Sequence, residues 1–395
     1  MMSIAKILRV REENASLLYT VYFAYFVSGM INILIGTILP FMKAEYNMSY
    51  VLSGSVISAY QLGSLAAMMI SGFLPYLIGR KKSTLTLSLG FIIGFLLMTL
   101  TGNPFFLLFA FFLTGIGRGT MSNISNVVIS DISENKTAAL NLLHAFFAIG
   151  AFLAPFLALL TTAVFGVYWR ISLWTVVVLE VLVMFFFSRS TLSGKSIEKQ
   201  KDVTTGFYKD KSYWLNTAIL FFYLCTEASI IGWLVTYFTD SGTLSAALAQ
   251  TTSSALWVFI LVGRLLCAYL STRLNKNLLL VFLGFFQILF FLLMISSTNY
   301  IFIYLSIFGF GLAMSGTYPM VLATMNPKYN VSTVAVGTAL ATATVGAIGM
   351  PIIVGAVAQN IGIAGGLATI SIILVCMFIL ILIKFFSGKK TVKNV

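Results

Sequence analysis

Apolar residues in this chain are grouped in long uninterrupted runs rather than in alternating or amphipathic patterns. A run of about 20 apolar residues is long enough for an α-helix to cross the hydrocarbon core of a bilayer. Twelve runs reach this length, with approximate limits 17–40, 50–73, 83–101, 105–130, 137–164, 170–188, 213–238, 246–271, 278–297, 300–324, 334–359 and 364–386. The pattern predicts an all-α membrane protein with twelve transmembrane helices.

The longest polar interval divides these runs into six and six. We therefore expect an N-terminal six-helix half over residues 1–188, a linker over 189–211, and a C-terminal six-helix half over 212–395. The segment Gly150-Ala-Phe-Leu-Ala-Pro155 recurs as Gly346-Ala-Ile-Gly-Met-Pro351, an offset of 196 residues. Internal repeats of this kind are typical of transporters with two related halves.

The composition excludes a soluble globular domain. Hydrophobic residues make up 59% of the chain and charged residues only 9%, and the mean hydropathy is +1.00. The net charge of +13 follows from topology, because nearly all basic residues flank the runs on the side that holds the N-terminus. Lys43 and Arg170 lie on the other side, and Arg118 and Arg264 lie within runs. The positive-inside rule then places both termini and the linker on the cytoplasmic side of the membrane. We expect this to be the cell membrane (inner or plasma membrane), and no nucleic-acid partner is expected.

Residues for enzyme or metal chemistry are scarce. The chain has a single histidine, and its cysteines (Cys225, Cys267 and Cys376) lie in apolar runs without metal-ligand spacing. Phosphate-binding loops and catalytic-triad motifs are also absent from the sequence. We therefore predict neither an enzyme nor a cofactor or metal site.

The run 105–130 carries a polar face. Helical spacing places Thr114, Arg118, Ser122 and Asn126 on one side. A charged side chain at this depth costs roughly 2.5–3.5 kcal/mol, so we expect Arg118 to face a protein interior or an aqueous cavity. Three glycines in the same run permit close approach of a neighbouring helix or a ligand: Gly115, Gly117 and Gly119.

Other ionisable residues lie within the runs and have two interpretations each. Glu227 is either a substrate-binding and proton-coupling acid, which we favour, or a structural partner for a helix dipole or a serine. His144 relays protons or makes an interhelical hydrogen bond. For Glu180 we favour a role in helix packing, and for Arg264 a side chain that extends towards the cytoplasmic interface.

Amide and aromatic side chains inside the runs suit a sugar, because amides exchange hydrogen bonds with hydroxyl groups and rings stack on pyranose faces. The candidate residues of this type are Asn32, Gln61, Asn126, Trp233, Trp257 and Tyr318. With aromatic residues at 14% of the chain, core packing or an interfacial belt is the alternative for each ring.

The segment Gly72–Lys82 resembles the signature loop of the major facilitator superfamily, with glycines at Gly72 and Gly79 followed by Arg80–Lys82. The signature's aspartate and first arginine would fall at Tyr76 and Leu77, so both are missing. Further segments are similar to the fucose–proton-symporter-like branch, which includes bacterial glucose/mannose symporters and sodium-dependent glucose transporters. They are Tyr60-Gln61, Gly115-Ile-Gly-Arg-Gly-Thr120, Leu143–Ala151, Thr226-Glu227, Gly232-Trp233, Trp257, Gly263-Arg264 and Gly316-Thr-Tyr-Pro319. Members of this branch often have a carboxylate near Ser122 or Asn123, where this chain has none.

The resemblance implies a secondary active transporter that moves a small polar solute, with a sugar expected, by alternating access and symport with H+ or Na+. In the resembled fold, helices 1, 4, 7 and 10 line the cavity, so Arg118 and Glu227 are expected to face each other. The expected substrate-binding residues are Asn32, Gln61, Arg118, Asn126, Glu227, Trp233, Trp257 and Tyr318, and Glu227 and His144 are expected to couple protons. A monomer in the lipid bilayer is expected.

The main alternative is drug or metabolite efflux by proton antiport. Against it, residues 151–154 between Gly150 and Pro155 lack the glycine-dense antiporter pattern. A membrane enzyme would need clustered His, Asp or Cys residues, and a non-transporting receptor would not need mid-membrane charges in both halves.

Overall fold

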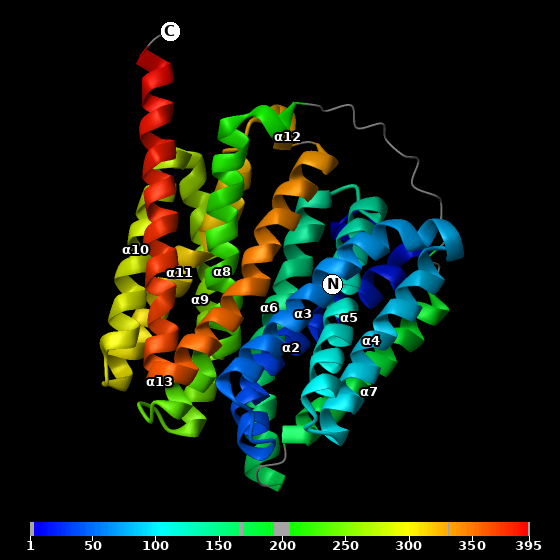
Figure 1. The fold of residues 1–395 in the computed structure, drawn as a ribbon. Helices are drawn as coiled ribbons and strands as arrows, with labels where there is room; N and C mark the ends of the chain where they lie inside the picture. Colours follow the sequence, from blue (N-terminus) through cyan, green and yellow to red (C-terminus); the bar gives the residue numbers. More distant parts are fainter. Residues whose placement is uncertain (1–3, 166–168, 191, 193–205, 331, 394–395) are drawn as a thin grey trace. The chain divides into compact units, whose positions relative to one another are not determined.

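The computed structural model describes residues 4–165, 169–190, 192, 206–330 and 332–393. Nearly all of these residues are helical (Figure 1). The α-helices are α1 (Ile4–Ile7), α2 (Ala15–Glu45), α3 (Tyr50–Ile78), α4 (Arg80–Leu100), α5 (Pro104–Ile132), α6 (Lys136–Phe165), α7 (Trp169–Arg189), α8 (Lys211–Asp240), α9 (Ala246–Arg273), α10 (Lys276–Ser296), α11 (Tyr300–Ala323), α12 (Pro327–Asn330) and α13 (Thr333–Lys393). Among the described residues, 11 helices are long and apolar enough to cross a membrane, which confirms a multi-pass membrane protein.

The helix α13 accounts for the difference between 11 helices and twelve predicted spans. It contains non-helical backbone at Ile361 (φ −126°, ψ 16°) and at Gly362 (φ 85°, ψ 164°). The Gly362 conformation is one that residues with a side chain rarely adopt. This break lies between the predicted spans 334–359 and 364–386, so α13 comprises both of them. The prediction of an all-α membrane fold with these spans is confirmed.

Asparagine and glycine mark several helix starts, as their chemistry predicts. The Asn103 side chain accepts a hydrogen bond from the backbone N–H of Phe105, and Asn275 and Asn299 cap α10 and α11 in the same way. Gly79 precedes α4 with a φ of 82°. The interval 74–82 between two predicted runs is mostly helical, because α3 continues to Ile78 and residues 80–82 form the first turn of α4.

The chain forms two compact units, one of residues 1–48 and 55–198, the other of residues 49–54 and 199–395. In the first unit α2 packs against α6, and α4 packs against α5 and α7. In the second unit α8 packs against α13, and α11 packs against α9 and α10. Most of the predicted linker, residues 193–205, lies outside the described residues, and the predicted division at 189–211 stays a prediction.

The repeated Gly-x4-Pro segment makes a similar contact within each unit. A Cβ atom added at Gly150 would lie 2.0 Å from the Phe26 carbonyl oxygen, and one added at Gly346 would lie 2.8 Å from the Phe221 carbonyl oxygen. In both units, the absence of a side chain lets two helix backbones touch. The contact joins α2 to α6 in the first unit and α8 to α13 in the second.

Candidate functional site

The Arg118 side chain belongs to a polar cluster in the first unit. Its Nη1 donates a hydrogen bond to Gln61 Oε1 at 2.9 Å, and its guanidinium carbon lies 5.3 Å from the centre of the Tyr60 ring. The Tyr60 hydroxyl in turn donates to Asn32 Oδ1 at 3.1 Å. We call Asn32, Tyr60, Gln61 and Arg118 the Arg118 cluster. It brings together side chains from α2, α3 and α5.

Glycine packing sets the geometry of this cluster. A Cβ atom on Gly115 would lie 2.0 Å from the Tyr60 carbonyl oxygen, and one on Gly63 would lie 2.0 Å from the Phe112 carbonyl oxygen. The backbones of α3 and α5 are therefore in contact, as the glycines of the 105–130 run predicted. Arg118 lies three residues after Gly115, about one helical turn from the place where α5 contacts α3. From there its side chain reaches the Tyr60 ring and the Gln61 amide.

The charge of Arg118 is stabilised by neutral groups. Among the described residues it forms no ion pair with a carboxylate, and Gln61 engages one of its five N–H donors. A cation above an aromatic ring gains about 0.5–2 kcal/mol, depending on desolvation. A partly buried guanidinium with unengaged donors is suited to bind the oxygen atoms of a polar ligand.

In the second unit, Glu227 forms a smaller cluster. The Tyr223 hydroxyl, one helical turn earlier on α8, donates to Glu227 Oε1 at 3.0 Å. The Tyr318 ring of α11 lies 6.0 Å from the Tyr223 ring. We call Tyr223, Glu227 and Tyr318 the Glu227 cluster. The expectation that Arg118 and Glu227 face each other stays a prediction.

The other predicted site residues differ in their surroundings. Asn126 Nδ2 donates to the Ser122 carbonyl of its own helix at 2.7 Å, and the His144 ring lies edge-on to Tyr25 at 5.5 Å. Trp233 has no exposed surface, and its indole N–H donates to the Pro351 carbonyl oxygen at 3.2 Å. Trp257 is also buried, with 5% of its surface exposed. Trp233 thus packs between α8 and α13 in this structure, and its role in substrate binding stays a prediction.

One charged network was not predicted from the sequence. Arg170 binds Glu45 through its two terminal guanidinium nitrogens, Nη2 at 2.6 Å and Nη1 at 2.7 Å, and its Nε donates to the Thr99 carbonyl oxygen at 3.1 Å. The Trp169 indole also donates to Glu45, at 2.7 Å. The network joins the ends of α2, α4 and α7. Burial raises the pKa of the adjacent Tyr46 phenol above its ordinary value of 10.0, so this hydroxyl stays neutral. Its oxygen accepts a further hydrogen bond from Arg170 Nη2, at 3.0 Å.

The signature loop forms contacts within the first unit although its aspartate is missing. Arg80 Nη1 lies 2.9 Å from Asp131 Oδ2 near the end of α5, and Lys81 Nζ donates to the Ser190 carbonyl oxygen at 3.1 Å. The basic residues after Gly79 thus connect the start of α4 to the ends of α5 and α7.

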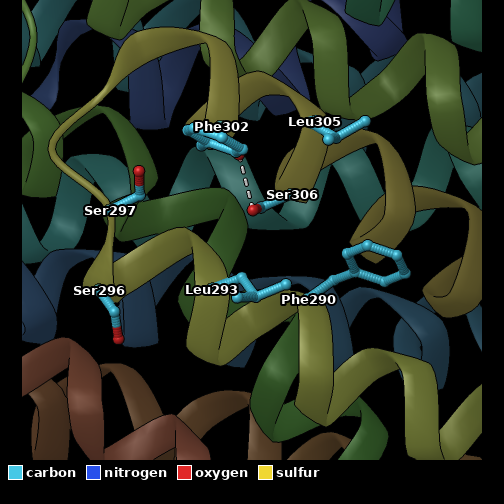
Figure 2. Close-up of a pocket in the computed structure, with 7 residues that line it drawn as sticks. All are labelled: Phe290, Leu293, Ser296, Ser297, Phe302, Leu305 and Ser306. Atoms are coloured by element: carbon cyan, nitrogen blue, oxygen red, sulfur yellow. Dashed lines mark hydrogen bonds between the residues drawn. The ribbon is translucent and has the colours of Figure 1, made fainter.

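A crevice in the second unit lies where α10 leads into α11, with a volume of about 190 Å³ (Figure 2). It is lined by Phe290, Leu293, Ser296, Ser297, Phe302, Leu305 and Ser306. The Ser306 hydroxyl donates to the Phe302 carbonyl oxygen within its own helix, at 2.7 Å. The lining has no charged side chain and no predicted site residue, so we do not assign the crevice to the transported solute.

In the described part of the chain, no group of three or more His, Cys, Asp or Glu residues is placed to hold a metal ion.

Known proteins resemble the chain over nearly its whole length. The TsgA homolog of Buchnera aphidicola subsp. Baizongia pistaciae is 20% identical over 366 residues, covering 92% of this chain and 93% of that protein. The structure of the nucleoside transporter NupG (D323A mutant) has a TM-score of 0.76 at 14% identity, covering 93% of this chain and 100% of the other. The structure of a D-xylose–proton symporter has a TM-score of 0.75 at 13% identity, covering 95% and 97%.

A family model identifies the superfamily of this chain directly. The Major Facilitator Superfamily model matches residues 21–348, which is most of the chain and includes both polar clusters. The protein is therefore a multi-pass membrane transporter rather than an enzyme, and its chain belongs to the Major Facilitator Superfamily.

Proposed function

We propose that this transporter carries a small polar solute, with sugars as the favoured class, together with H+ by alternating access. The observation that carries the proposal is the Arg118 cluster, in which a guanidinium is held inside the membrane-spanning region by an amide and an aromatic ring. Hydroxyl-rich solutes need such mixed donors, acceptors and ring faces. The D-xylose–proton symporter and the nucleoside transporter that share the fold support this class, since a nucleoside also carries a sugar ring.

The proposed substrate groups come from both units. In the first unit they are Arg118, Gln61, Asn32 and, further along α5, Asn126. In the second they are Glu227, Trp233, Tyr318 and Trp257. Arg118 donates to hydroxyl oxygens, the amides both donate and accept, and the Tyr318 ring offers a stacking face. We further propose that the chain belongs to the fucose–proton-symporter-like branch and acts as a monomer in the cell membrane, with both termini in the cytoplasm.

Glu227 is the proposed coupling acid. It is partly buried and accepts a hydrogen bond from Tyr223. A membrane-embedded carboxyl that binds a proton loses its charge, which lowers the cost of moving the loaded site through the cycle. His144 is the proposed relay in the first unit. If Na+ rather than H+ is the coupling ion, a sodium gradient will drive uptake in place of a pH gradient.

The test is counterflow and gradient-driven uptake into proteoliposomes, with a panel of labelled sugars and nucleosides. We expect a sugar to exchange, and an inward proton gradient to drive its accumulation. Glu227→Gln should abolish accumulation but keep exchange, because exchange requires binding without net proton movement. The matched variant Tyr223→Phe removes only the hydrogen bond to the carboxyl and should keep accumulation.

Two results would count against the proposal. If Glu227→Gln accumulates the solute against its gradient as the unmodified protein does, Glu227 is not the coupling acid. If no sugar exchanges and an apolar drug moves outward against a proton gradient, the protein is an efflux antiporter instead.

A further inference from the structure

Glu180 lies at the middle of α7, on the face of that helix that packs inward. The buried residues of α7 recur at helical spacing as Trp169, Ser172, Leu173, Val176, Glu180, Val183 and Phe187. Only 1% of the Glu180 surface is exposed. Neither carboxyl oxygen has a hydrogen-bond partner among the described residues. Glu180 is thus a buried acid that makes no visible polar contact.

Contacts at both ends of α7 show which residues of α4 lie opposite Glu180. Arg170 Nε donates to the Thr99 carbonyl oxygen, and Lys81 Nζ donates to the Ser190 carbonyl oxygen, so the two helices run antiparallel. Counting inward from these contacts places Glu180 opposite residues 89–91, which are Leu, Gly and Phe. The charged residues of α4, at 80–82, are at its far end. Ser88 lies near the Glu180 level, and its buried hydroxyl also lacks a partner in the described part of the chain.

The other helices that pack against α7 over several residues are α2 and α6. Two contacts align α2 with α7: Glu45 with Arg170, and Phe23 with Phe186. Between these two contacts, the titratable residues of α2 are Tyr25 and Lys43, and each lies close to one of the contacts. On α6, the Thr161 hydroxyl contacts Ser172 at 2.7 Å, and the titratable residues are Lys136 and His144. At 1.5 Å per residue, His144 lies about 13 Å along the helices from the Glu180 level. Among the described residues, the charged side chains of α2, α4 and α6 are therefore all near an end of α7.

We propose that Glu180 is a proton-binding site and that its bound proton holds α7 in this packing. An ionised carboxyl without a partner is strongly disfavoured in such surroundings, so this packing requires the neutral acid. The neutral acid still lacks hydrogen bonds, so an arrangement that lets it reach water or a polar group is the competing state. The buried arrangement binds the proton more tightly. It is therefore favoured at low pH and is lost as the pH rises.

This site is separate from the proposed coupling role of Glu227 and does not depend on it. Its first test is infrared spectroscopy of the purified full-length protein in lipid nanodiscs at neutral pH. We expect a C=O stretching band of a protonated carboxyl that lacks hydrogen bonds. The band should disappear in Glu180→Gln and remain in Glu227→Gln. A spectrum that is unchanged by Glu180→Gln overturns the proposal.

The second test is hydrogen exchange of the α7 amides as a function of pH, corrected for the intrinsic pH dependence of exchange. One linked proton makes protection fall by up to about tenfold per pH unit once the proton is released in the competing state. Glu180→Gln, which stays neutral, should remove this dependence, and Glu180→Leu provides a second neutral variant if the glutamine variant folds poorly. Equal pH slopes in the unmodified protein and in the neutral variants overturn the switch. Neither test requires transport, so the outcomes of both tests do not depend on the solute or on the proposed role of Glu227.

Discussion

The substitution Gly115→Ala tests whether the contact between α3 and α5 positions Arg118. The new Cβ atom would lie 2.0 Å from the Tyr60 carbonyl oxygen, 2.9 Å from its carbonyl carbon and 3.0 Å from the Ser64 nitrogen. Two of these groups are backbone atoms of Tyr60 and none is the flexible end of a side chain. The helix α3 must therefore move away by roughly 1 Å, the shift that overpacked cores typically resist.

The magnitude follows from two contributions. Overpacking a helix contact costs about 1–3 kcal/mol. A shift of α3 also lengthens the 2.9 Å hydrogen bond between Arg118 and Gln61, and a hydrogen bond to a charged group contributes about 1.5–3 kcal/mol when buried. Because Arg118 is only partly buried, we take the lower part of that range. The expected loss in the free energy of unfolding is about 2.5–4.5 kcal/mol.

The assay combines thermal unfolding of the purified protein with initial rates of solute exchange in proteoliposomes. Gly115→Ala should lower the melting temperature by several degrees and reduce exchange. The control is Gly349→Ala in α13, where an added Cβ atom meets nothing within 4 Å, and both quantities should remain unchanged. A Gly115→Ala variant that melts and exchanges like Gly349→Ala would refute the argument that this glycine contact sets the geometry of the site.

Three further predictions concern stability and topology. Arg170→Lys keeps the positive charge but loses the bidentate contact with the Glu45 carboxylate, so the melting temperature should fall by the equivalent of about 1–3 kcal/mol. The control is Arg11→Lys, which should leave the melting temperature unchanged because the ion pair of Arg11 is exposed and 3.7 Å long. Gly362→Ala places a side chain on a backbone with φ 85° and should lower the free energy of unfolding, measured by thermal unfolding, by about 1–3 kcal/mol. The control is Gly337→Ala, which should not destabilise the protein because the site is helical and has open space for a Cβ atom. Equal melting temperatures of the two variants would argue against strain at the break in α13. A cysteine replacing Lys209 in a cysteine-free background should resist a membrane-impermeant thiol reagent added to intact cells, because the positive-inside rule places this segment in the cytoplasm; labelling from outside would reverse the topology.

The sequence by itself determined the membrane-spanning elements of this protein. Run length and polarity are properties of consecutive residues, so the twelve spans were predictable without knowing any contact. The separation of 334–359 from 364–386 was predictable for the same reason, although the non-helical backbone at Gly362 was seen only in the structure. The polar face with Arg118 was also visible, because helical spacing places side chains at known angles.

Only the tertiary structure decided which groups meet. Several findings depend on which helices cross and at what level. They are the Tyr60 and Gln61 partners of Arg118, the Glu45 partner of Arg170, and the lack of a hydrogen-bond partner for Glu180 in the described part of the chain. A tryptophan in an apolar run has the same local pattern whether it stacks on a ligand or packs, so the burial of Trp233 against Pro351 was not predictable. The hydrophobic requirement of a membrane span acts along one helix, whereas hydrogen bonds and burial depend on the positions of residues far away in the chain.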